Sequence, residues 1–382
     1  MWEARADLTR RHGGVAVAVV YGLAYLGLNE IGVRLALPPA GFAVFWPAAG
    51  LALTAFVLTP IDRWWALIVG QTVANLSGNL VHGTPLKVTV WFVVANLVES
   101  CGGAAVIRSV PANGRRASQP GQWVAYGLSG LIANTMVAAL IAASALVWVA
   151  DVPGGFASAW RTWWVADAVG ILSVAPIVLF WPSEQPLGRG MRRAVEFGGA
   201  LLTAWVLTIV IFVRSEGQST PKGVVYLLVP ALLWPALRLG RAAAASVFTG
   251  ALVIAVWLTS RGDGPFAHSH VAPIDDALDV QLFFSVLGAS VLLVAFAIEL
   301  MRRAERAGAL ASIERQERGR LESVLAETAE LGKERERLLG RAELLAEVSA
   351  VLDRAMTVED QLDRLVDVVA QRLGAWCGID LI

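Results

Sequence analysis

Acidic and amide side chains occur inside otherwise apolar stretches of this sequence, and they are the groups best able to bind a polar ligand. A charge deep in a bilayer is costly and usually faces a bundle interior or a cavity. Each acid in such a stretch is therefore a functional candidate. The residues are Asn29, Glu30, Asn75, Asn96, Glu99 and Asp167.

The spacing of these residues indicates which of them can act together. Asn96 and Glu99 are three residues apart, and Trp163 and Asp167 are four apart, so each pair shares one helix face. We expect these acids and amides, together with Trp46 and Trp163, to form one polar, aromatic-lined pocket that opens to the outside of the membrane. The alternative is that these groups bond to each other across helices and only specify the bundle.

The elements that carry these residues are predicted membrane spans. Of 382 residues, 56% are hydrophobic and 16% are charged, which excludes an ordinary cytosolic enzyme. Crossing the hydrocarbon takes roughly 20 apolar residues. We predict an all-α, polytopic transmembrane helix bundle with ten spans, or alternatively eight. The segments are 15–37, 42–59, 64–81, 87–108, 122–149, 160–182, 194–213, 223–238, 241–260 and 278–300.

Charge divides the chain near residue 302. Residues 1–301 hold 33 charged side chains, and residues 302–382 hold 29. We therefore expect a cytoplasmic segment at 1–13, a membrane domain at 14–301 and a cytoplasmic tail. With ten spans, fourteen basic residues fall on the side of the termini and five on the other. The positive side is cytoplasmic, so both termini are predicted to lie inside the cell.

Several motifs resemble a known family in their order and spacing. They are Phe45-Trp46-Pro47-Ala48-Ala49-Gly50, Asn96-Leu97-Val98-Glu99, the run from Trp163 to Gly170 with Pro176, the run from Pro230 to Arg241, and Gly262-Asp263-Gly264-Pro265-Phe266. Over about residues 14–301 the chain resembles the first-type membrane-associated sensor (MASE) family of bacteria. The resemblance implies a sensory role in the bacterial inner membrane and usually eight spans. It also implies an output domain such as a histidine kinase, a GGDEF-type cyclase or a protein phosphatase.

The residue pattern of the tail predicts a coiled coil over 302–345. Leu310, Val324, Leu331, Leu338 and Leu345 recur at heptad spacing, while the companion row four residues later is mixed. This pattern favours a weak parallel coiled coil and a homodimer, with a single solvated helix as the alternative. Residues 346–382 resemble the opening helix and first strand of a GAF domain, which we expect to be truncated. The alternative is a helical cap.

No nucleophile constellation, phosphate-binding loop or kinase signature is present, so we expect no enzyme activity in these residues and no cofactor. His268 and His270, with nearby aspartates, could hold a metal, but their spacing is not diagnostic. A solvated outer loop explains them, and we expect no metal. The near-zero net charge gives no indication of nucleic-acid binding.

Two functions remain. The first is a sensor of a small ligand or a partner membrane protein, signalling through the tail. The second is a transporter or channel that the tail dimerises; broken helices and midplane acids suit both.

Overall fold

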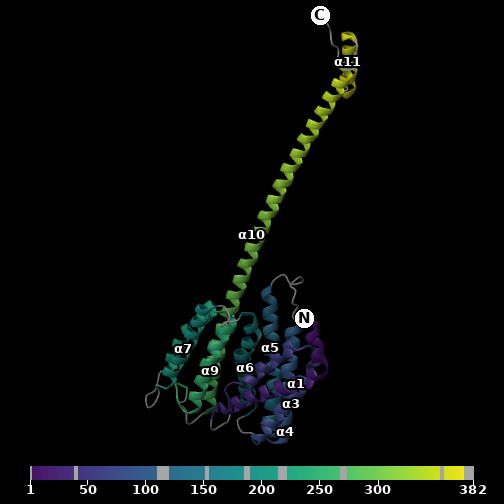
Figure 1. Cartoon of the computed structure of the whole chain (residues 1–382). Coiled ribbons are helices and arrows are strands. Elements are labelled where there is room, and N and C mark those ends of the chain that lie inside the picture. Colours follow the sequence, from purple (N-terminus) through teal and green to yellow (C-terminus); the bar gives the residue numbers. More distant parts are fainter. Residues whose placement is uncertain are drawn as a thin grey trace. The chain divides into compact units, whose positions relative to one another are not determined.

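The computed structural model describes residues 2–37, 42–109, 120–150, 155–184, 190–213, 222–266, 273–352 and 357–373. The chain divides into two compact units, Met1–Met301 and Arg302–Ile382. The boundary coincides with the change in charge density. Apart from two paired strands of two residues each, the regular elements of the described residues are helices (Figure 1).

Among the described residues, ten α-helices occupy the ten predicted segments, which confirms an all-helical membrane bundle. Seven are long and apolar enough to cross a membrane, α2 and α8 are shorter, and α3 carries amide side chains and is not among the seven. The helices are α1 (Trp2–Arg34), α2 (Pro47–Leu58), α3 (Trp64–Val81), α4 (Leu86–Ser109), α5 (Pro120–Ser144), α6 (Phe156–Glu184), α7 (Met191–Val213), α8 (Leu228–Arg238), α9 (Arg241–Ser260) and α10 (Pro273–Leu352).

The first helix differs from its predicted segment at both ends. It begins at Trp2, so the expected cytoplasmic segment is part of the same helix, and it ends at Arg34. An antiparallel hairpin follows, in which β1 (Ala36–Leu37) pairs with β2 (Phe42–Ala43). The physical reason lies in Pro38-Pro39, because a residue before proline is pushed out of the helical region.

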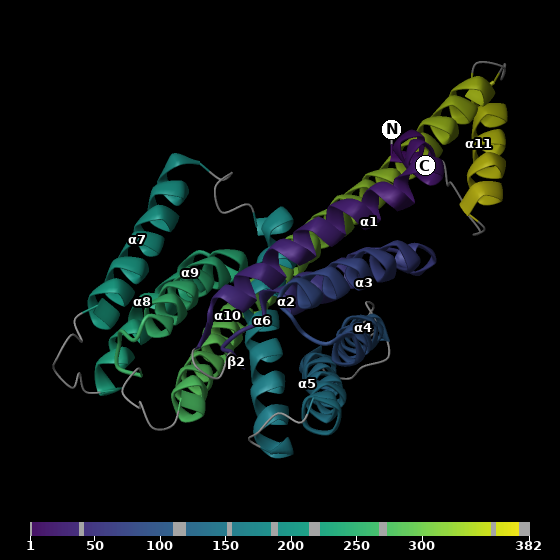
Figure 2. The ribbon, with the colours of Figure 1, turned by 90° about the horizontal axis from the view of Figure 1, so that it is seen from below.

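Seen from below, the helices of the first unit form two groups around a shared centre (Figure 2). The group α1, α3, α4 and α5 lies on one side, α7, α8 and α9 lie on the other, and α2, α6 and the membrane part of α10 lie between them. One apolar core includes Tyr25 and Phe56, and a larger one includes Phe212, Phe248 and Phe284. The central helix α6 contacts both groups, through α5 on one side and α9 on the other.

At one end of this bundle, arginine side chains form contacts between the ends of neighbouring helices. Arg241, at the start of α9, donates Nε to Glu184 Oε1 at 2.7 Å, and its guanidinium lies over the rings of Phe180 and Phe296. Glu184 also accepts the backbone N–H of Ala242 at 2.9 Å. Phe296 lies on α10 just before Met301, so this end of the bundle is both arginine-rich and the end at which α10 leaves the unit.

The second unit contains the C-terminal part of α10, which ends at Leu352, and α11 (Val358–Leu373). The apolar side chains of the better-filled heptad row are exposed in the single chain, with Leu310 68% and Leu331 64% accessible. The predicted strand at 374–382 lies outside the described residues.

Candidate functional site

The segment that carries Trp46 lies directly against α6, and this contact organises the candidate site. Trp46 donates its backbone N–H to the carbonyl oxygen of Ala166, with 3.0 Å between nitrogen and oxygen. Two glycines permit the close approach. A Cβ on Gly170 would overlap the carbonyl oxygen of Trp46, and a Cβ on Gly50 would lie 2.5 Å from the carbonyl oxygen of Gly170. The motifs at 45–50 and 163–170 are therefore packed against each other.

Two acids of the predicted site, Glu99 on α4 and Asp167 on α6, are buried in the bundle at 2% exposure each. They lie within electrostatic reach of each other. Glu99 Oε1 and Asp167 Oδ2 have no hydrogen-bond partner in the structure. A buried carboxyl without such a partner is costly. This acid pair is consequently the strongest candidate among the described residues for recognising a polar ligand.

The hydroxyl of Tyr25 on α1 lies beside this acid pair. It accepts a hydrogen bond from Asn75 Nδ2 on α3 at 3.1 Å. Tyr25 also lies within electrostatic reach of Glu99 and Asp167 and next to the indole of Trp46. The Trp46 Nε1 is buried without a hydrogen-bond partner. The structure thus brings four predicted residues, Trp46, Asn75, Glu99 and Asp167, together around Tyr25.

Asn96 belongs to a neighbouring hydrogen-bond network that joins three helices. Gln71 on α3 accepts from the Tyr21 hydroxyl at 2.9 Å and donates Nε2 to the carbonyl oxygen of Asn96 at 3.1 Å and to Ser100 Oγ at 3.0 Å. All four groups are buried. This network corresponds to the alternative interpretation, in which polar groups specify the packing of α1, α3 and α4.

Glu30 is not brought into the buried acid pair. Its carboxylate accepts from Arg34 Nε at 2.7 Å and lies 2.7 Å from His82 Nε2, and its side chain is 36% exposed. Asn29, the preceding residue, is buried, and its Oδ1 has no partner. The side chain of Asn29 packs against Gly78 of α3. Adjacent residues of one helix point in different directions, so Asn29 faces the bundle while Glu30 remains accessible.

Trp163 lies in an apolar cluster. Its ring centroid is 4.9 Å from that of Phe92 on α4, and both contact the cluster that includes Val88 and Ala142. The contact joins α4 to α6 next to the acid pair. Trp163 therefore packs these two helices together.

Some buried polar residues were not predicted as site residues. Tyr21 and Tyr25 are four residues apart in the first apolar segment, and that helical spacing was an available indication that both hydroxyls face the bundle. Gln281 on α10 is fully buried and donates Nε2 to two carbonyl oxygens on other elements. Its contact partners are separated from it by more than a hundred residues, so no local pattern could reveal them.

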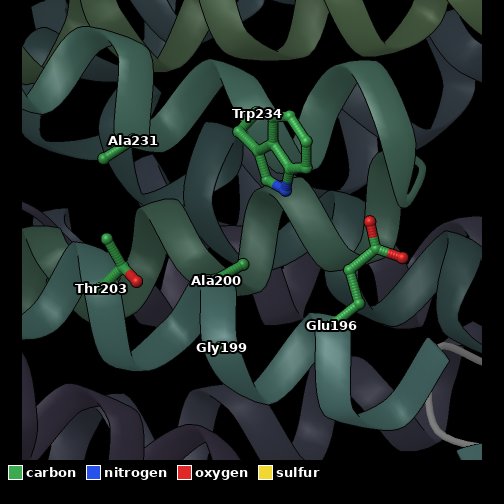
Figure 3. A pocket seen from close by; sticks show the side chains of 6 residues that line it. All are labelled: Glu196, Gly199, Ala200, Thr203, Ala231 and Trp234. Atoms are coloured by element: carbon green, nitrogen blue, oxygen red, sulfur yellow. The ribbon is translucent and has the colours of Figure 1, made fainter. Parts of the chain in front are cut away.

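Two surface cavities lie away from the acid pair. One, of about 290 Å³, is lined by Glu196, Gly199, Ala200 and Thr203 of α7 and by Ala231 and Trp234 of α8 (Figure 3). Glu196 forms an ion pair with Arg238. The other, of about 660 Å³, lies between α8 and α10 and is mainly apolar, with Phe283 and Val286 in its lining. None of the predicted site residues lines either cavity.

Metal binding has no support in the described residues, where no group of three or more His, Cys, Asp or Glu side chains could hold an ion. The predicted alternative at His268 and His270 lies outside the described residues.

The family model MASE1 matches residues 14–301, which is more than two thirds of the chain and all of the first unit after its first turns. No curated protein and no solved structure matches the chain. The family match covers both the acid pair and the membrane part of α10.

Proposed function

Because the chain belongs to the MASE1 family of membrane-associated sensor domains, we propose that its acid pair is the recognition site and that its last span carries the response to the cytoplasm. The family membership makes residues 14–301 a membrane sensory input domain. The observation that carries the finer proposal is the position of Glu99 and Asp167, which are buried, lie within electrostatic reach of each other and have no hydrogen-bond partner at one carboxyl oxygen each.

A polar ligand, or a polar group of a partner membrane protein, would supply the missing hydrogen bonds. Leaving a buried polar atom unsatisfied costs about 1–3 kcal/mol, and more for a charged group. A ligand that satisfies such atoms stabilises the arrangement of α1, α2, α4 and α6 in which they converge. It therefore shifts the bundle toward that arrangement by the difference in its affinity for the two states.

The direction of signalling follows from charge. Arg108, Arg193, Arg238 and Arg241 make contacts at the end of the bundle where α10 leaves it. Positive charge marks the cytoplasmic side. This supports a cytoplasmic tail and an inner-membrane location, with the site reached from within the bilayer or from outside.

The tail is proposed to act as a dimeric coiled coil leading to an output domain. Its exposed heptad leucines would be covered by a second copy of this chain. The mixed companion row supports a seam of marginal stability, in which two arrangements of the pair differ by little free energy and respond to a small change at the membrane.

The proposal is tested by hydrogen–deuterium exchange of the full chain in lipid nanodiscs. Asp167→Asn and Glu99→Gln replace each carboxyl group with an amide of nearly the same shape, so exchange in residues 302–352 should change by at least about fivefold relative to the wild type. Glu30→Gln is the control, because this acid lies outside the buried pair, and it should leave the tail unchanged. Equal tail exchange in all four proteins would contradict the proposed function.

The ligand itself can be sought by native mass spectrometry of the same proteins. We expect a compound that is retained by the wild type and Glu30→Gln and is lost from the Asp167→Asn variant. Equal retention by every protein would place the compound at another site.

A further inference from the structure

A single glutamine joins the last span to α6, which carries Asp167, and to the strand that precedes Trp46. Gln281 on α10 donates Nε2 to the carbonyl oxygen of Ala43 at 3.1 Å and to the carbonyl oxygen of Thr162 at 3.3 Å. Its side chain is fully buried. Ala43 ends β2, and Thr162 lies in the first turns of α6, so one amide group bridges three elements.

These two acceptors lie next to the site in the sequence. Trp46 follows Ala43 by three residues, and Asp167 follows Thr162 by five. The two segments also contact each other through the hydrogen bond from Trp46 N to Ala166 O. A shift of the Trp46 segment against α6 must therefore change the distance between the two carbonyl oxygens that Gln281 binds.

Two other contacts of α10 in this region are apolar. Phe284 lies 6.1 Å from Phe248 between ring centroids, and Gly288 packs against the same ring. Apolar contacts are non-directional, so a helix can slide or rotate on them at small cost. A hydrogen bond constrains both distance and angle. Gln281 thus provides α10 with a directional contact to the site.

Helix geometry then extends this contact to the membrane exit. Gln281 precedes Met301 by twenty residues of the same helix, which correspond to roughly 30 Å at the rise of an α-helix. A rotation or displacement imposed at Gln281 therefore reaches the arginine-rich end of the bundle without passing through a loop.

We propose that Gln281 is the positioning residue that couples the acid site to α10, by holding the helix to the carbonyl oxygens of Ala43 and Thr162. The inference rests on the proposed function, in which the state of the acid pair alters the tail. The inference adds the physical connection between the acid pair and α10, which is the side-chain amide of Gln281.

The test is a double-mutant cycle with Asp167→Asn as the perturbation and Gln281→Met as the interruption. Methionine has a similar length and suits an apolar site, but it cannot donate a hydrogen bond. Exchange in residues 302–352 is measured in nanodiscs for the wild type, each single variant and the double variant. We expect the effect of Asp167→Asn to fall from about fivefold to less than about twofold in the Gln281→Met background.

Gln71→Met is the matched control. Gln71 is another buried glutamine, and its hydrogen bonds to Tyr21, Asn96 and Ser100 join α1, α3 and α4 without reaching α10. The full effect of Asp167→Asn on the tail should persist in this background. Gln281→Asn is the second interrupting variant, because its amide is one methylene shorter, and thermal unfolding of each variant verifies the fold.

The outcomes separate the two proposals. If Asp167→Asn alters the tail equally with and without the Gln281 amide, the coupling role of Gln281 is wrong and the proposed function stands. If Asp167→Asn never alters the tail, both are wrong. Loss of the effect in the Gln71→Met background as well would also overturn the inference, since it would indicate a general loosening of the bundle.

Discussion

Gly170 illustrates how one residue determines the geometry of the site. Its Cα faces the carbonyl oxygen of Trp46, and the adjacent backbone of α6 accepts the Trp46 N–H. Small residues let helix backbones approach closely in membrane proteins. The backbone at Trp46 can therefore lie against α6, which carries Asp167, only because position 170 has no side chain.

We predict that Gly170→Ala destabilises the membrane unit by about 1–3 kcal/mol, because the added methyl group forces the Trp46 segment away from α6. Gly198→Ala is the control. A Cβ there would meet no neighbouring atom, and alanine favours the helix by about 1 kcal/mol over glycine. Thermal unfolding in detergent measures both, and equal stability of the two variants would contradict the packing described for Gly170.

At this scale the acids differ in a way that composition could not indicate. Glu30 and Asp167 both lie in apolar segments. Glu30 pairs with Arg34 and His82 at the surface of the unit, whereas Asp167 is buried with an unpartnered oxygen. The rotation of each helix decides which of its side chains enters the core.

At the scale of elements, α2 and α8 are shorter than the helices that are long enough to cross a membrane. α2 begins at Pro47, where proline is well accommodated because the first helical N–H has no partner within the helix. Its C-terminal carbonyl oxygens are bound by other groups instead: Trp64 Nε1 donates to Phe56 and Thr59, and Arg108 donates to Val57. Side chains of neighbouring helices thus satisfy the carbonyl oxygens at the C-terminal end of α2.

The tail of α10 is predicted to pair with a second copy along its heptad leucines. Leu331→Cys should form an intermolecular disulfide under mild oxidation in native membranes, in a background of Cys101→Ser and Cys377→Ser. Lys333→Cys lies about 200° around the helix from position 331 and should cross-link far more slowly. Equal rates at the two positions, judged from the dimer band on a non-reducing gel, would favour the single solvated helix.

Element boundaries followed the sequence where composition changes abruptly. α3 and α9 have the predicted bounds, 64–81 and 241–260, because charged or loop residues flank both. The paired strands at 36–37 and 42–43 were predicted as the ends of two spans. Their residues are as apolar as their neighbours, and the only local indication against a helix is the sequence Pro38-Pro39.

At the scale of the whole molecule, the topology itself is open to test. We predict that both ends of the membrane unit face the cytoplasm, because the arginine contacts gather at the end where α10 leaves the bundle. A fluorescent protein fused after Arg303 should be bright in bacterial cells, and alkaline phosphatase fused there should be inactive. Phosphatase fused after Asp263, in the loop between α9 and α10, should be active.

If the chain crosses the membrane an odd number of times before Arg303, the fluorescent protein fused there should be dark and the phosphatase fused there should be active. The phosphatase fused after Asp263 then shows on which side the loop between α9 and α10 lies. An active phosphatase at both positions would contradict the proposed orientation.

The sequence by itself determined that this is a helical membrane protein with a charged tail beginning near residue 302, and its ordered motifs indicated the sensor family. Hydrophobicity, charge density and motif order are properties of contiguous residues, so they can be recognised without coordinates. Only the tertiary structure decided that Tyr25, Trp46, Glu99 and Asp167 converge, that Glu30 does not join them, and that Gln281 binds the two segments beside them. Those contacts depend on the rotation and close approach of helices from distant parts of the chain, which the glycines at 50 and 170 permit but which no local pattern specifies.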